Sequence, residues 1–205
     1  MPAVQPTLPG MDVFTLLDEI QTIARNGLEF AENPFDRERY ERLSDVAARS
    51  YAERLALPDH VVSARFTQEL GYITPKVGAD AAIFDAQERL LVERRSDDGC
   101  WGLIAGWVEP GESPAETVVR EAHEETGLQI AVLQLVDVIA RPASVEYGPH
   151  AMVAVLYLCE VVGGEPALSH EVTELAYRHI DEVEGWHRNH EQYARRALAA
   201  HRAAT

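Results

Sequence analysis

The most distinctive part of this chain is GWVEPGESPAETVVREAHEETGL, residues 106–128. Ser113 followed by Pro114 is typical of a helix N-terminus, and Glu116 would complete a capping box with Ser113. Gly127 suits the left-handed conformation in which many helices end. The stretch therefore predicts a loop followed by a short helix that begins after Ser113 and ends at Gly127.

Three carboxylates share one face of this predicted helix. Glu121 and Glu125 are four residues apart, and Glu124 is three residues from Glu121, so their side chains overlap. Like charges at this spacing repel one another. A run of glutamates is ordinarily a solvated acidic face, but a hard divalent cation such as Mg²⁺ would relieve the repulsion because it prefers oxygen ligands. We therefore interpret the helix as a candidate metal site.

The spacing of these residues matches a known pattern. Gly106 is followed after five residues by Glu112, and after seven more by REAHEETGL at 120–128. This order resembles the Nudix box, the signature of the Nudix hydrolases. The resemblance implies a loop-helix-loop that binds Mg²⁺ or Mn²⁺ and cleaves a pyrophosphate joined to another group.

The resemblance also implies roles for individual residues. Glu121, Glu124 and Glu125 would be the metal-binding carboxylates. Glu112 and Arg120 would form an ion pair that braces the loop against the helix, which places Arg120 among the catalytic residues. In some members the glutamate at the position of Glu112 lies near the metals as well.

Two further parts of the implied site are a backbone ligand and a general base. The backbone carbonyl near Gly106 is a further metal ligand in many members of the family. Nudix enzymes often take a general base from outside the box, and the segment HEVTELAY offers Glu171 and Glu174. Glu171 is the preferred extra carboxylate, although a solvated loop glutamate is the competing interpretation. If the base lies within the box, Glu124 is the natural candidate.

Candidate substrate contacts lie outside the box. Arg94 ends a predicted strand near the place where phosphates enter in related proteins. Arg141 and His150 flank a predicted loop between two long strands, and the planar donor fork of an arginine suits a phosphate. Trp101 and Trp107 bracket the loop before the helix, where a role in the core is favoured over stacking on a base.

Residues 1–73 predict a small all-α domain. Apolar residues at helical spacing predict a helix in 11–30 that is interrupted at Asn26-Gly27, a second in 35–55 and a short third in 60–70. So few helices have too little core to stand alone. Their apolar face must therefore pack within the chain or against a second copy, and both remain open.

Residues 74–205 predict an α/β domain. Segments rich in β-branched and apolar residues predict strands before and after the box, and the last segment predicts a helix: 76–85, 89–95, 128–143, 150–162 and 187–203. This order favours an α/β sandwich with mixed sheets. Among such folds the resemblance selects the Nudix α/β/α sandwich, preceded by the helical N-terminal domain.

The helical segment adds a second resemblance. Residues 17–43, followed by GYITPKVGADAAIF at 71–84, are similar to a Nudix subgroup with a helical N-terminal domain. That subgroup includes CDP-choline and ADP-ribose pyrophosphatases that form dimers. The resemblance implies CDP-choline as the first choice of substrate, ADP-ribose as the alternative, and a homodimer. A non-catalytic nucleotide-sensing module is the alternative of another class, but it predicts loss of Glu121 or Glu125, and both are present.

Composition narrows the function further. The 205 residues carry a formal net charge of −16, which argues against general nucleic-acid binding because phosphate contacts need Lys and Arg. The two cysteines, Cys100 and Cys159, have no CxxC partners and favour a reducing compartment. No segment has the length of apolar residues needed to span a membrane or the pattern of a secretory signal. We therefore expect a cytoplasmic enzyme.

Overall fold

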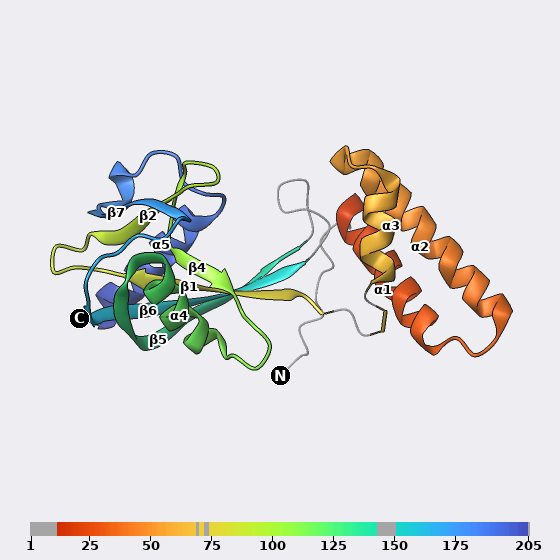
Figure 1. The fold of residues 1–205 in the computed structure, drawn as a ribbon, viewed down its shortest axis with the longest axis horizontal. Coiled ribbons are helices and arrows are strands. Elements are labelled where there is room, and N and C mark those ends of the chain that lie inside the picture. Colours follow the sequence, from red (N-terminus) through yellow and green to blue (C-terminus); the bar gives the residue numbers. More distant parts are fainter. Residues whose placement is uncertain (1–11, 69, 72–73, 143–150, 205) are drawn as a thin grey trace, which may run out of the picture. The chain divides into compact units, whose positions relative to one another are not determined.

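The computed structural model describes residues 12–68, 70–71, 74–142 and 151–204. Its helices and strands fall into two compact units, which Figure 1 draws and which are described separately here. The first unit extends to Lys76, and the second begins at Val77. Arg141 and Met152 fall in the first unit as well. The domain division expected between residues 73 and 74 stays a prediction.

The first unit is helical. It contains α1 (Val13–Phe30), α2 (Pro34–Leu55) and α3 (Asp59–Thr67). Asp12 and Asn33 cap α1 and α2, because the side-chain oxygen of each accepts hydrogen bonds from backbone N–H groups of the first turn. The buried core of the unit is formed by Leu17, Ala47, Ala48, Tyr51, Ala52, Val62 and Phe66. The predicted helical module, including its short third helix, is confirmed.

The interruption expected at Asn26-Gly27 is wrong, because α1 continues to Phe30. A Cβ atom added to Gly27 would overlap the ring of Tyr40 on α2. The glycine therefore lets two helices approach closely instead of ending one of them. A glycine within a helix costs roughly 1 kcal/mol relative to alanine.

The second unit contains two sheets. Its strands are β1 (Lys76–Ile83), β2 (Leu90–Arg95), β3 (Trp101–Gly102), β4 (Ile104–Trp107), β5 (Leu128–Arg141), β6 (Met152–Gly164) and β7 (Val172–Arg178). One sheet has the order β4-β1-β6-β5 and the other the order β3-β2-β7. The predicted α/β sandwich with mixed sheets, preceded by helices, is confirmed.

The helix of the box, α4 (Pro114–Thr126), contacts both sheets through β4 and β7. Its buried Val118 and Ala122 join a core made by residues of both sheets: Ala79, Ala81, Ile83, Leu91, Ile104, Leu128, Ile130 and Cys159. The short helix η1 (Ile180–Glu182) and α5 (His190–Ala204) complete the unit. Within the described ranges, no helix is both long and apolar enough to cross a membrane.

Three strands were not expected from the sequence. β3 and β4 are only two and four residues long, and such short runs show no clear alternation. β7 begins at Val172, within a segment expected to be a loop. It pairs antiparallel with β2, where Glu174 lies opposite Arg94, and it brings Glu171 to the start of a strand beside the box.

Candidate active site

Local capping fixes the helix of the box. Ser113 accepts a hydrogen bond from the backbone N–H of Glu116, and the Glu116 carboxylate accepts one from the backbone N–H of Ser113 at 2.8 Å. Pro114 opens the first turn. Gly127 ends the helix with a φ of 73°, in the left-handed region that glycine adopts without strain. The predicted helix and both of its caps are confirmed.

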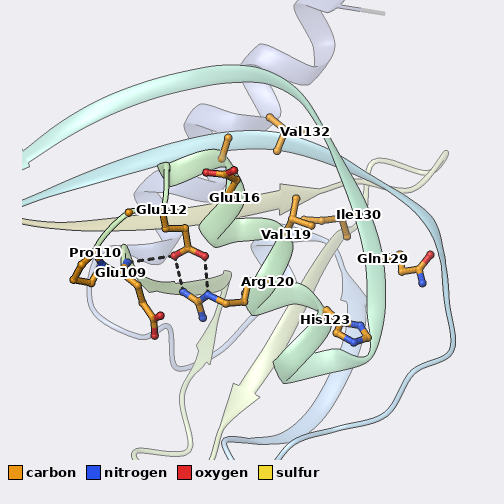
Figure 2. A pocket seen from close by; sticks show the side chains of 12 residues that line it. Glu109, Pro110, Glu112, Glu116, Val119, Arg120, His123, Gln129, Ile130 and Val132 are labelled. Atoms are coloured by element: carbon orange, nitrogen blue, oxygen red, sulfur yellow. Dashed lines mark hydrogen bonds and ion pairs between the residues drawn. The ribbon is translucent and has the colours of Figure 1, made fainter.

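Arg120 and Glu112 form a two-pronged ion pair between the helix and the preceding loop. Arg120 Nε donates to Glu112 Oε1 at 2.8 Å, and a terminal nitrogen donates to Glu112 Oε2 at 3.0 Å. The Thr117 hydroxyl donates to the same oxygen at 2.8 Å. Figure 2 shows the pair, whose side chains are only 24% and 16% exposed. The geometry holds the loop to the helix as the sequence predicts.

The other terminal nitrogen of Arg120 joins two further carboxylates to this ion pair. It donates to Glu121 Oε1 at 2.8 Å and to Glu124 Oε2 at 3.0 Å. A Cβ atom added to Gly106 would overlap the carboxyl group of Glu121. Glu121 therefore lies directly over the backbone of β4, where only a glycine leaves room for it.

Glu125 is the most deeply buried of the three box glutamates, and it meets a residue that the sequence did not single out. It is 5% exposed, and its carboxyl group interacts with that of Glu93 on β2, which is 1% exposed. Burial raises the pKa of both carboxyl groups, more strongly for Glu93, and the charges of Glu121 and Glu171 raise that of Glu125 further. The one signal for Glu93 in the sequence was the alternation of side chains along β2, which places Glu93 on the same face as the buried Leu91.

The residues present suit a divalent cation. Among the described residues, no three His, Cys, Asp or Glu side chains converge closely enough to hold one as they stand, and Arg120 is paired with Glu121 and Glu124 instead. Oε2 of Glu93 and Oε2 of Glu125, however, are buried without a hydrogen-bond partner. Buried carboxylates are stable when paired or bound to a metal, and an all-oxygen set matches Mg²⁺ or Mn²⁺.

Glu171 lies beside the box. Its backbone carbonyl accepts a hydrogen bond from the N–H of Ser96 at 2.8 Å, and its side chain is 60% exposed. Its charge contributes to raising the pKa of both Glu121 and Glu125, so it belongs to the same electrostatic cluster. Glu174, on β7, instead accepts a hydrogen bond from Arg178. The segment of Glu171 lies against the end of the box helix, because the backbone N–H of Ser169 donates to the carbonyl of Glu125 at 3.0 Å.

The candidate substrate residues are less closely gathered. Arg94 is exposed on β2, and its Nε donates to the carbonyl of Gly99 at 3.1 Å. Arg141 is 7% exposed and belongs to the first compact unit, so its part in this site stays a prediction. His150 lies outside the described residues.

The two tryptophans differ in solvent exposure. Trp101 is buried at 8% exposure, as expected for a core residue. The core role expected for Trp107 is wrong, because its side chain is 54% exposed. Trp107 ends β4, and its backbone carbonyl accepts a hydrogen bond from Arg120 at 3.2 Å. A large aromatic surface therefore lies exposed next to the ion pair.

A pocket of about 940 Å³ opens beside the loop and the outer face of α4. Figure 2 shows the side chains that line it, among them Glu112 and Arg120 at one end and Ile130 and Val132 of β5 at the other. Val119 of α4 also contributes an apolar wall. Glu121, Glu124 and Glu125 do not line this pocket, so it adjoins the ion pair rather than the buried carboxylates.

We expect Glu112→Gln to lower the melting temperature at neutral pH, with a deficit that disappears in acid. The hydrogen bonds from Arg120 and Thr117 lower the pKa of Glu112 from 4.5 to about 2. A lowered pKa means that the carboxylate stabilises the fold fully above its ordinary pKa and loses this effect as the pH falls through about 2. Melting curves of both proteins from pH 7 to pH 2 check this.

Glu160→Gln removes the same charge from an exposed position on β6 and serves as the control. It is expected to melt with the wild type across this range. A deficit of Glu112→Gln that stayed constant down to pH 2 would contradict an ion-pair origin.

Comparison with known proteins agrees with the geometry. Residues 74–200 match the family described as the NUDIX domain, and residues 11–66 match the family described as UDP-X-like, N-terminal oligomerisation domain. The putative ADP-ribose pyrophosphatase YjhB of Bacillus subtilis is 32% identical over 159 residues, which cover 77% of this chain and 76% of that protein.

Solved structures show the same fold. An ADP-ribose pyrophosphatase of Streptococcus suis has a TM-score of 0.54 and 27% identity, covering 63% of this chain and 93% of its own. A structure titled UDP-X diphosphatase has a TM-score of 0.58 and 24% identity, covering 93% of this chain and 94% of its own. Because the NUDIX match spans more than half of the residues and includes every position of the box, this chain belongs to the Nudix hydrolase family.

Proposed function

We propose that this protein hydrolyses the pyrophosphate of a nucleoside diphosphate joined to another moiety, with Mg²⁺ or Mn²⁺ as cofactor. The observation that carries the proposal is the intact box. Glu121, Glu124 and Glu125 lie on one helix, Arg120 orients the first two of them, and Glu125 presents a buried oxygen without a partner. A bound divalent cation screens the phosphate charge and lowers the pKa of an attacking water.

The residues of the chain would do the remaining work. Water attacks one phosphorus, the bridging P–O bond breaks, and the products are a nucleoside monophosphate and a phosphorylated partner. A base must accept the proton of the attacking water, and Glu171 is our preferred candidate because it is exposed beside the carboxylates. Glu124 is the alternative, but Arg120 already donates to its carboxylate.

ADP-ribose is the substrate that the comparisons favour. A relative at 32% identity is named a putative ADP-ribose pyrophosphatase and one at 36% an ADP-ribose pyrophosphatase, whereas the preference for CDP-choline expected first from the sequence has no such support. The exposed Trp107 offers a surface on which a nucleobase can stack, and it adjoins the ion pair. We therefore place ADP-ribose before CDP-choline and keep both in the test.

The test is a panel of ADP-ribose, CDP-choline, a UDP-sugar, NADH and 8-oxo-dGTP at equal concentration, with Mg²⁺, with Mn²⁺ or with EDTA. We expect ADP-ribose to be cleaved to AMP and ribose phosphate with kcat/KM at least about tenfold above the others, and no turnover in EDTA. Assaying Glu171→Gln and Glu124→Gln on the best substrate then identifies the base by the larger loss of kcat.

Different outcomes separate the hypotheses. Preferential cleavage of CDP-choline would restore the first expectation and replace ADP-ribose as substrate. Tight binding of one compound without release of monophosphate under any metal condition would overturn the hydrolase and indicate a nucleotide sensor.

We also propose that two copies associate through the helical unit. The matched family of residues 11–66 is described as an oligomerisation domain. Large apolar side chains on α1 and α2 are exposed, including Leu16, Ile23, Leu43 and Val46. Burying them would enlarge the small core of the helical unit. Light scattering on the full chain tests this, because a dimer has twice the mass of one chain.

A cytoplasmic location is also proposed, and the two free cysteines agree with it.

A further inference from the structure

Glu93 is a buried acid outside the box. It lies on β2, the middle strand of the sheet β3-β2-β7, and it pairs with Gly102 on one side and Leu175 on the other. Only 1% of its surface is exposed. A carboxyl group in such a place costs free energy unless it keeps its proton, is paired with a cation or binds a metal. Its position in the sheet therefore calls for a proton or a compensating cation.

Among the described residues, the cation whose charge acts on Glu93 is Arg95, but the hydrogen bonds of Arg95 go to another acid. Arg95, two residues along the same strand, donates through both of its bonding nitrogens to Asp97, at 3.0 and 2.9 Å. Arg120 donates to other carboxylates and to a backbone carbonyl. The side chain that Glu93 does meet is Glu125, which is also an acid.

Each of these two acids leaves one oxygen without a partner. Oε2 of Glu93 and Oε2 of Glu125 are both buried and accept no hydrogen bond. Glu93 offers its oxygen from β2, and Glu125 offers its oxygen from α4. Together they could bind a cation from two sides, which carboxylates on one helix could not do. Hard divalent cations take six or more oxygen ligands and gain from such a set.

We propose that Glu93 is a further ligand of the divalent cation, contributing from β2 an oxygen beside that of Glu125. The inference rests on the proposed metal-dependent hydrolysis and adds a residue outside the box to its metal site. It also gives a reason for a glutamate to be buried within this sheet, because the cation would bind the carboxylate oxygen that accepts no hydrogen bond.

A purely structural role would have different consequences. If Glu93 only held Glu125 by sharing a proton, glutamine would preserve most of that contact, because its amide donates and accepts hydrogen bonds in the same shape. Metal affinity would then be nearly unchanged. Loss of a ligand, in contrast, weakens metal binding even where the fold and the contact with Glu125 remain.

The experiment is a titration of the full chain with Mn²⁺, in which free Mn²⁺ is followed by electron paramagnetic resonance. Wild type, Glu93→Gln, Glu93→Asp and the surface control Glu160→Gln are compared, each with a melting curve in EDTA. We expect Glu93→Gln to bind Mn²⁺ about ten- to a hundredfold more weakly, while Glu160→Gln binds as the wild type does. In EDTA, Glu93→Gln should melt at or above the wild-type temperature, because it removes a buried acid.

Glu93→Asp keeps the charge on a shorter side chain and is expected to lose Mn²⁺ affinity by about tenfold, so it decides the question if the glutamine variant does not fold. Unchanged Mn²⁺ affinity in a folded variant would overturn the inference. If the wild type binds Mn²⁺ and hydrolyses ADP-ribose while the variants bind equally well, only the role of Glu93 falls. If the wild type neither binds Mn²⁺ nor cleaves any compound of the panel, the proposed function falls and this inference falls with it.

Discussion

Glu125→Gln is expected to reduce kcat on the best substrate by about a hundred- to a thousandfold, because loss of a metal-binding carboxylate removes several kcal/mol of transition-state stabilisation. The substitution preserves shape and removes a buried acid next to Glu93. Folding should therefore be retained, with a melting temperature in EDTA equal to or above that of the wild type. Steady-state kinetics with Mg²⁺, together with melting curves with and without the metal, check both parts.

The melting curves make this prediction specific. Wild type should gain stability when Mg²⁺ is added, because a ligand that binds only the native state stabilises it. Glu125→Gln should lose most of that gain, whereas Glu160→Gln on the exposed strand position should keep it. Full activity in Glu125→Gln would show that the centre of the chemistry lies elsewhere.

Gly106→Ala is expected to have the second largest effect, and for a steric reason. The added methyl group would occupy the space of the Glu121 carboxyl group, which must then leave its place over β4. Its bond with Arg120 is lost with it. We expect kcat/KM to fall by about a hundredfold, comparable to misplacing a catalytic group by about 1 Å.

Gly163→Ala is a matched control on β6. There the new methyl group would meet Gln129 Oε1 at 3.1 Å, the end of a side chain that can move by a few tenths of an ångström. We expect this variant to keep its activity. If Gly106→Ala also kept full activity and metal affinity, the position of Glu121 against the strand would not matter to the reaction.

The sequence predicted those parts of the fold that depend on local interactions. Ser113, Glu116 and Gly127 define the ends of α4 through neighbours in the chain, so their pattern was sufficient. Gly27 was misinterpreted because its reason is Tyr40, a residue of another helix. β7 was missed for the same kind of reason, since pairing with β2 stabilises a segment with a weak strand pattern of its own.

The site residues likewise fall into those predicted from local sequence and those that depend on tertiary contacts. The ion pair of Glu112 and Arg120 was implied by the resemblance to the Nudix box, and both of its residues lie on one loop and helix. Glu93 was not expected, because its meaning depends on Glu125, which a different element brings to it. The exposure of Trp107 likewise depends on what the tertiary structure leaves uncovered. Local residue patterns therefore did not predict the features of the site that depend on contacts between distant segments.

The sharing of one guanidinium among three carboxylates has a consequence for ion selectivity. Arg120 pairs with Glu112, Glu121 and Glu124, so this cluster retains two uncompensated negative charges when all three acids are ionised. A divalent cation would cancel both of these charges, whereas Na⁺ or K⁺ would cancel only one, and an ionised Glu125 would add a further negative charge to be balanced. Charge balance alone therefore favours divalent over monovalent ions at this site, before ligand number or ionic radius discriminates among them.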